Sequence, residues 1–83
     1  MSWFVYILRC SDNSLYCGAT TDLGRRIEAH DSGAGARYTR SRLPVRLVWH
    51  VQTKSKSEAF KEEFRIKRLP KDEKELLVAS QPG

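Results

Sequence analysis

Five side chains with reactive groups occur along this chain, in segments that a short fold can bring together. Tyr6 and Tyr16 carry phenols, Arg26 and His30 share the next segment, and Glu63 lies much further along. Cleavage of a phosphodiester needs a group that takes a proton from water, charge that balances the phosphorane-like state, and a group that holds the leaving oxygen. A phenol, a guanidinium, an imidazole and a carboxylate can fill these roles.

Arg26 and His30 are four residues apart in a predicted helix, so they lie one above the other on one face. Leu23 and Ile27 mark the core stripe beside them. The pair can therefore point into a cleft between the helix and a sheet. A solvated basic edge explains the same spacing.

Glu63 lies within the apolar arc of a second predicted helix. At ~100° per residue, Glu63 falls near the middle of this arc and Glu62 towards its edge. The apolar residues that define the arc are Ala59, Phe60, Phe64, Ile66 and Leu69. A carboxylate in a core-facing stripe is costly unless a cation, a shifted pKa or a metal ion compensates it. A structural salt bridge, for example with Arg26, is one solution, and a bound metal ion is another.

Tyr6 and Tyr16 are expected on two paired strands. Tyrosine is common in strands for packing reasons alone. A phenol with a reference pKa near ~10 becomes a useful base only when nearby cations draw its proton away. Packing and catalysis are therefore both open for these side chains.

A small α+β scaffold is indicated by the pattern of apolar and turn-forming residues. The predicted strands span residues 3–10, 15–19 and 45–51, the first two forming a hairpin. The predicted helices span residues 23–30 and 58–69, with a last short helix that begins at Pro70. The order β-β-α-β-α-α favours a three-stranded antiparallel sheet flanked by helices.

Local signals refine these elements. Residues 20–22 offer N-cap candidates for the first helix, Gly33 ends it, and Ser57 caps the second. Residues 31–44 are rich in Gly, Ser and Arg and are expected to form a loop. Four residues alternate along the third strand and are expected to share one face: Val45, Leu47, Trp49 and Val51.

The composition favours a small globular protein with a polyanionic partner. Eighty-three residues indicate a single domain over residues 1–83, with a core at about 3–77 and a tail at 78–83. The net charge of +5, with nine arginines, favours nucleic acid or a phosphorylated ligand, although many soluble domains are basic.

The two cysteines and the hydropathy indicate a cytoplasmic protein. Cys10 and Cys17 are too few for a disulfide scaffold or a structural zinc site, so we expect reduced thiols, which can face each other across the hairpin. The N-terminal segment has no basic leader or cleavage site, and no run approaches the ~20 apolar residues needed to cross a bilayer. No membrane partner is expected.

Four motifs occur in a fixed order along the chain. They are FVY (4–6), YCG (16–18), TDLGRRIEAH (21–30) and SEAFKEEFRIKRL (57–69). This ordered set resembles the GIY-YIG nuclease superfamily, in particular its small single-domain bacterial branch. The segment GARYTRSRLPVRLVW (35–49) resembles the same branch, and the likeness covers about residues 3–77.

The resemblance implies a role for each of the five reactive side chains. Tyr6 would be the general base or the phenol that orients water, and Tyr16 would position the phosphate and the attacking water. Arg26 would contact the scissile phosphate, and His30 would assist the phosphate or a proton relay. Glu63 would be the metal ligand.

The resemblance also implies one divalent cation, Mg²⁺ or Mn²⁺. The cation would be held by Glu63, and by Glu62 if the helix register is shifted by one residue. In the first motif Phe4 and Val5 replace Gly-Ile, and in the second Cys17 replaces the central isoleucine. These positions are expected to shape strand packing. The retained Gly18 fits a close approach of the backbone to a neighbour or a ligand.

A basic segment around residues 33–46 is expected to grip the substrate, because arginine forks suit phosphate oxygens and tyrosine can stack on an unpaired base. A flexible basic loop that binds nothing in particular is the plainer interpretation. The residues expected to bind nucleic acid are Arg25, Arg37, Tyr38, Arg40, Arg42 and Arg46.

The residues and the resemblance together predict an endonuclease that hydrolyses DNA with a metal-bound water, and they leave RNA open as a substrate. One small domain offers little surface for reading a long duplex sequence, which favours single-stranded, flap or branched substrates. We expect a monomer or a weak homodimer. A catalytically inactive nucleic-acid-binding module is the main alternative, and a protein-interaction domain is a third.

Overall fold

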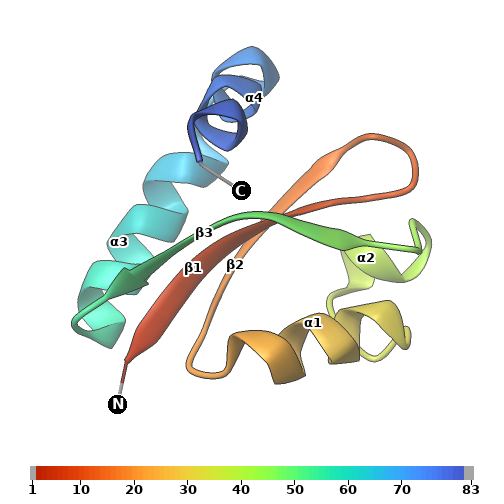
Figure 1. Cartoon of the computed structure of the whole chain (residues 1–83), viewed down its shortest axis with the longest axis horizontal. Coiled ribbons are helices and arrows are strands. Elements are labelled where there is room, and N and C mark those ends of the chain that lie inside the picture. Colours follow the sequence, from red (N-terminus) through yellow and green to blue (C-terminus); the bar gives the residue numbers. More distant parts are fainter. Residues whose placement is uncertain (1, 82–83) are drawn as a thin grey trace.

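Three antiparallel strands form the centre of the molecule: β1 (Trp3–Arg9), β2 (Leu15–Thr20) and β3 (Arg46–Thr53). The computed structural model describes residues 2–81 (Figure 1). The strand order is β2-β1-β3, so β1 is the central strand and its residues 5–8 are buried. The predicted three-stranded antiparallel sheet is therefore confirmed.

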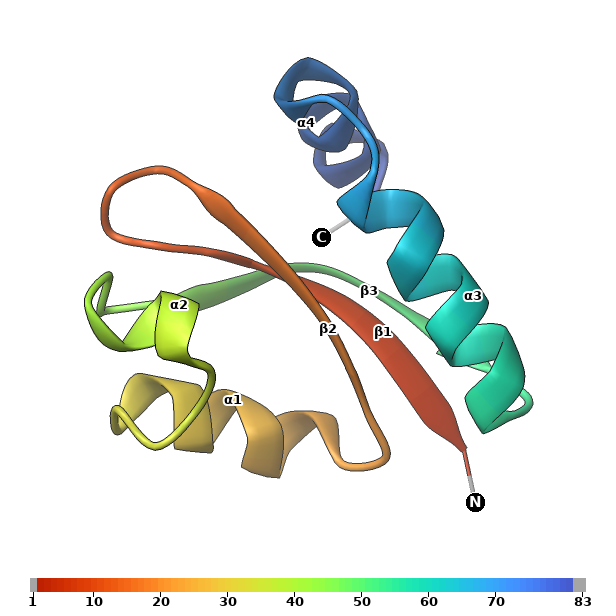
Figure 2. The same cartoon turned by 180° about the vertical axis from the view of Figure 1, so that it is seen from behind.

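Helices cover both faces of this sheet. The helices α1 (Leu23–Asp31) and α2 (Arg37–Arg40) lie on one side, and α3 (Lys56–Lys67) and α4 (Lys71–Ser80) lie on the other (Figures 1 and 2). The predicted order is confirmed, with one addition. The single turn of α2 lies inside the segment that the sequence predicts as a loop.

The alternation of side chains along β1 divides the interior into two clusters. Val5 and Ile7 point towards α3, whereas Tyr6 and Leu8 point towards α1. The thiols follow the same division, because Cys17 packs with Val5 and Ile7 while Cys10 packs with Tyr6 and Leu8. The expectation that the two cysteines can face each other across the hairpin is therefore wrong.

Strand β3 departs from the alternation that its sequence predicts. Trp49 pairs with Ile7 but Leu47 pairs with Leu8, so a bulge leaves Val48 as an extra residue. A bulge of one residue moves the following side chains to the other face. Leu47 consequently packs in the cluster on the α1 side and Trp49 in the cluster on the α3 side. The expectation that these residues share one face is wrong.

The helix termini follow local capping. Asp22 accepts a backbone hydrogen bond at the start of α1, as predicted, and Gly33 adopts a φ of +85° just beyond its end. Helix α3 begins earlier than predicted because Ser55, and not Ser57, accepts the capping bond from the backbone three residues later, at 3.1 Å.

Polar contacts attach α4 to the sheet. Glu75 accepts two hydrogen bonds from Arg9, at 2.7 and 2.9 Å. Gln81 accepts a bond from the His50 backbone N–H at 2.8 Å and donates one to its carbonyl at 2.6 Å. Residues 78–80 of the predicted tail belong to α4, and residues 82–83 lie outside the described residues. None of the helices within residues 2–81 is long and apolar enough to traverse a bilayer.

Candidate active site

Four of the five predicted catalytic side chains meet on the α1 side of the sheet. The Tyr6 hydroxyl lies 2.9 Å from His30 Nε2, and Arg26 Nε donates to the same hydroxyl at 3.4 Å. The rings of Tyr16 and His30 have centroids 5.3 Å apart. Tyr6 and His30 are fully buried, whereas Arg26 is exposed. A buried phenol–imidazole pair therefore lies beneath a guanidinium that solvent reaches.

Two glycines make room for this pair. Gly18 is the cross-strand partner of Tyr6, and a β-carbon at Gly18 would clash with the phenol and its hydroxyl. A β-carbon at Gly35 would collide with the ring and backbone of His30. The sequence predicted a close approach at Gly18 but gave no signal for Gly35, because its partner lies on another element.

Thr39, which sequence reasoning missed, fixes the orientation of the imidazole. Its hydroxyl donates to the carbonyl of Ala36 at 2.9 Å and lies 2.9 Å from His30 Nδ1. The backbone N–H of Ala36 also points at Nδ1, but at 3.4 Å. We assign the proton to Nδ1, because the Thr39 hydroxyl gives its one proton to the Ala36 carbonyl and its oxygen then accepts from Nδ1–H at the shorter distance, which leaves Nε2 as the acceptor for the Tyr6 hydroxyl. Only the fold of α2 brings Thr39 to His30.

The electrostatics of the buried pair follow from desolvation. Burial raises the pKa of Tyr6, and the hydrogen bond and charge of Arg26 offset this in part. Burial and then the Arg26 charge lower the pKa of His30. At neutral pH the phenol therefore keeps its proton and the imidazole is neutral. In the free protein Arg26 therefore does not meet the condition under which the Tyr6 phenol becomes a useful base.

Glu63 lies on the other side of β2. Its side chain is 22% exposed and pairs with Lys67 Nζ at 3.5 Å. Burial and then the Glu63 carboxylate raise the pKa of Cys17 to about 12, which indicates that Glu63 lies beside β2. Lys67 Nζ is also 5.9 Å from the centroid of the Tyr16 ring. Lys67, which was not predicted, therefore connects Glu63 to Tyr16 around the edge of the sheet.

The buried face of α3 differs from the predicted apolar arc. Ala59 and Ile66 are buried, but Phe60 and Phe64 are exposed, so the face is displaced away from Glu63. Glu63 lies at the border of this face and not in its middle, and its salt bridge is to Lys67 and not to Arg26. The predicted arc was centred too close to Glu63, because the sequence pattern counts every apolar residue as buried and therefore included Phe60 and Phe64.

Glu62 lies at the opposite border of the same face. It forms an ion pair with Arg65 on the helix surface, and its effect on the pKa of Cys17 is the smallest of the contributing charges. Glu63 is therefore the better placed of the two carboxylates beside β2.

The donor set beside β2 fits a hard cation that has few protein ligands. Within residues 2–81 no three His, Cys, Asp or Glu side chains gather as a metal site. Mg²⁺ commonly keeps several waters and binds one or two carboxylates together with substrate phosphates. The half-buried carboxylate of Glu63 suits that mode of binding, with Lys67 as the cation to be displaced.

The residues predicted to bind nucleic acid are only partly brought together. Tyr38 stacks on Tyr16 with ring centroids 5.9 Å apart, so it extends the site. The Arg42 guanidinium lies 3.9 Å from the Tyr38 ring centroid and donates to Asp12 and to the Tyr38 carbonyl. Arg42 therefore holds the loop, and its Nε and Nη1 donors are already engaged.

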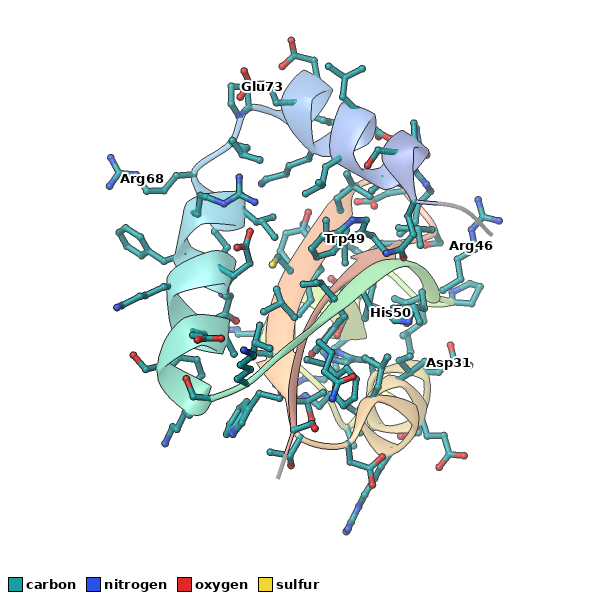
Figure 3. All side chains as sticks on the ribbon, turned by 60° about the vertical axis from the view of Figure 1, so that its left-hand side comes forward. Asp31, Arg46, Trp49, His50, Arg68 and Glu73 are labelled. Carbon is teal, nitrogen blue, oxygen red and sulfur yellow. The ribbon has the colours of Figure 1, made fainter. Side chains whose placement is uncertain are left out.

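The remaining arginines point in different directions. Arg25 lines a shallow pocket of about 270 Å³ next to Arg26, and Arg37 and Arg40 are exposed on α2. Arg46 lies on β3, at the sheet edge opposite β2, and Figure 3 shows it pointing outward. The structure thus does not place Arg46 with the other site residues.

Comparison with known proteins identifies the family to which this chain belongs. The family model described as GIY-YIG catalytic domain matches residues 2–75. The chain belongs to the GIY-YIG family. Membership of this nuclease superfamily supports a nuclease-like function for the GIY-YIG domain described here.

Similar proteins are found in several bacteria. A UPF0213 protein of Vibrio cholerae is 51% identical over 78 residues, which cover 93% of this chain and 77% of the relative. A UPF0213 protein of Desulfotalea psychrophila is 52% identical over 84 residues, covering 99% and 76%. The solution NMR structure of a UPF0213 protein from Bacillus halodurans is 49% identical, with a TM-score of 0.65 over 100% of this chain and 88% of that one.

Proposed function

We propose that this protein is a metal-dependent endonuclease that hydrolyses phosphodiester bonds in DNA and selects its substrate by structure. The buried hydrogen bond between Tyr6 and His30, with Arg26 above it, is the observation that supports the proposal most strongly. Buried titratable groups with shifted pKa values cluster at catalytic sites, which favours an enzyme over a module that only binds nucleic acid.

The proton path follows from the direction of these hydrogen bonds. Arg26 donates to the Tyr6 hydroxyl in the free protein and turns to the scissile phosphate when substrate binds. The phenolic oxygen then faces the attacking water and takes its proton while passing its own to His30 Nε2. As the water oxygen bonds to phosphorus, the bond from phosphorus to the leaving oxygen breaks, and the leaving oxygen takes a proton from solvent. The Thr39 hydroxyl holds the resulting imidazolium through Nδ1–H.

Glu63 and Tyr16 complete the site from the edge of β2. Tyr16 stands between His30 and Lys67, where its hydroxyl can position the phosphate. Glu63 would hold the divalent cation, Mg²⁺ or Mn²⁺, which when bound neutralises charge on the phosphate and acidifies water. Lys67 leaves Glu63 for a phosphate oxygen as the substrate enters.

A nuclease assay with a matched pair of carboxylate variants tests the proposal. Purified protein is incubated with single-stranded, duplex and branched DNA and with RNA, in Mg²⁺, Mn²⁺ or EDTA. We expect cleavage of DNA that EDTA abolishes. Glu63→Gln should lose at least about 100-fold in rate, because it removes the cation ligand. Glu62→Gln, one residue away and paired on the surface, should retain the wild-type rate.

Two results would contradict the proposal. Equal cleavage by wild type and Glu63→Gln would exclude this carboxylate from the reaction. Binding of DNA without cleavage under any metal condition would instead identify a binding module.

A further inference from the structure

The outer side of α3 and the residue after it form a ridge of two exposed aromatic rings between two cations. We define the aromatic ridge as Lys56, Phe60, Phe64 and Arg68. We propose that the aromatic ridge binds the bases of an unpaired DNA strand next to the candidate active site. This inference rests on the proposed function and names the substrate class that the site receives.

The two exposed rings offer an apolar surface on which a ligand can stack. Phe60 is 45% exposed and Phe64 is 62% exposed, although both lie on a helix that buries its other face against the sheet. Phe60 touches Trp3 edge-on, with ring centroids 5.6 Å apart, which holds it in position. A base stacked on such a ring removes apolar surface of both partners from water.

Each ring has its own cation. Lys56 Nζ lies 5.4 Å from the centroid of the Phe60 ring, and the Arg68 guanidinium lies 5.3 Å from that of Phe64. Bases alternate with phosphates along a single strand, and the aromatic ridge offers two adjacent rings for bases with a cation for phosphate at each end. Stacking on the rings and ion pairing with the cations are the two interactions that bind single strands without regard to sequence.

The aromatic ridge adjoins the candidate active site. Phe60 precedes Glu63 by three residues, so the two side chains are neighbours on the helix surface. Phe64 is related in the same way to Lys67, which contacts both Glu63 and the Tyr16 ring. A strand whose phosphate lies at Tyr16 therefore leaves the site directly onto Phe60 and Phe64.

The charges favour a nucleic-acid strand over a protein partner. The cores of protein–protein interfaces are depleted of lysine, whereas here Lys56 lies beside the exposed Phe60 ring. The chain as a whole carries a net charge of +5. In Figure 3 Arg68 points away from the sheet, where an approaching phosphate can reach it.

A binding experiment without cleavage tests the ridge separately from catalysis. Fluorescence anisotropy in EDTA measures the affinity of each variant for a labelled single strand and for the duplex of the same sequence. Phe64→Leu should weaken binding of the single strand about 10-fold and leave duplex binding within about twofold, because it removes a stacking ring and keeps an apolar side chain. Phe64→Trp should restore tight binding.

Leu76→Ala is the matched control. Leu76 is 71% exposed on α4, so this change removes a surface apolar side chain outside the aromatic ridge. It should leave both affinities unchanged. Melting temperatures should match wild type for all three variants, because each changes an exposed side chain.

The outcomes separate the two proposals. If Phe64→Leu binds the single strand as tightly as wild type, or loses duplex affinity equally, the ridge does not bind unpaired bases. If wild type is a dimer by sedimentation and Phe64→Leu is a monomer, the ridge is a self-association surface and the inference is overturned. Phe64-dependent binding of single strands without cleavage in Mg²⁺ or Mn²⁺ would support the ridge and reject the nuclease.

Discussion

The position of the Tyr6 hydroxyl depends on the absence of a side chain at Gly18 on the neighbouring strand. Gly18 has no β-carbon, and the Tyr6 ring fills the space that one would occupy. The phenol can reach His30 at 2.9 Å only because that space is free. Gly18 therefore acts as a positioning residue for the proposed proton path.

Gly18→Ala should lower both stability and activity. The added methyl group overpacks a buried site and displaces the phenol, at a cost of about 1–3 kcal/mol in the free energy of unfolding. Cleavage should fall more than stability explains at a temperature where the variant is folded. Denaturant unfolding and single-turnover cleavage measure the two effects.

Gly24→Ala provides the control for that substitution. A β-carbon at Gly24 meets nothing within 4 Å, and the residue lies in α1. This change should stabilise the protein by about 0.5–1 kcal/mol and leave cleavage unchanged. If the two alanine variants have the same stability and the same cleavage rate, the close approach of Tyr6 to Gly18 does not contribute to function.

His30 should make stability depend on pH in the weakly acidic range. Its pKa is lowered from 6.5 in the folded protein, so the unfolded chain binds the proton first as the pH falls. The free energy of unfolding should therefore be full above pH 6.5 and decrease below it, by at most about 1.4 kcal/mol per pH unit. Chemical denaturation at a series of pH values measures this slope.

Substitution of each histidine identifies the source of the slope. His30→Gln should remove it, whereas His50→Gln, on the exposed side of β3, should retain it. The cleavage rate should fall at a lower pH than the one where this slope begins, because His30 in the folded protein is protonated only below its own lowered pKa and then cannot accept the Tyr6 proton. A wild-type slope in His30→Gln would contradict the assignment.

At the scale of elements, the stability of the contact between α4 and β1 should depend on pH in the acidic range. The hydrogen bonds from Arg9, followed by that from Lys71, lower the pKa of Glu75 from 4.5 to about 2. Ionised Glu75 therefore stabilises the folded state above pH 4.5, and this contribution is lost as the pH falls towards 2. Solvent screening limits it to about 0.5–1 kcal/mol.

Glu75→Gln should lower the free energy of unfolding at pH 7 by that amount and should flatten its dependence on pH between 4.5 and 2. Thermal unfolding followed by circular dichroism measures both effects. Glu73→Gln, on the same helix and exposed, is the control and should behave as wild type. An unchanged acid transition in Glu75→Gln would show that Arg9 stabilises α4 through packing alone.

The elements themselves were largely predictable from the sequence, and their details were not. Apolar runs and turn residues predicted three strands and the helices in order, because these signals are local. The bulge at Val48 was not predictable, since it arises from pairing with β1. The exposure of Phe60 and Phe64 was not predictable either, because it depends on how α3 lies on the sheet.

The candidate site shows the same limit. Residue types and the family resemblance pointed to Tyr6, Arg26 and His30, and the structure brings these side chains into contact. Thr39 and the contact of Lys67 with Tyr16 carry no sequence signal, because each contact joins two separate elements. Contacts between separate elements are the part of a site that a single sequence does not encode locally.

At the scale of the whole molecule, the basic charge should appear as salt-dependent binding. Arg37 and Arg40 are exposed on α2, whereas Arg42 Nε donates to Asp12 and its Nη1 donates to the Tyr38 carbonyl. The double variant Arg37→Ala with Arg40→Ala should reduce the slope of log affinity against log salt for single-stranded DNA by about 1.4, two phosphates at about 0.7 each. Anisotropy titrations at several salt concentrations measure this slope.

Arg42→Ala is the comparison for these two arginines. It should leave the salt slope close to wild type and reduce the stability of the loop that carries Tyr38, because it breaks contacts within the protein. A slope reduced as much by Arg42→Ala as by the double variant would mean that the substrate recruits Arg42 from Asp12.

The Gln81 side-chain amide covers the backbone of the edge strand β3 at His50. Its two bonds to the His50 backbone imitate the pairing that a further strand would make at the open side of β3. An edge strand with free backbone groups invites another chain to add to the sheet. The backbone groups of His50 are already paired, so two molecules that meet along β3 at this residue must first detach Gln81 from one of them.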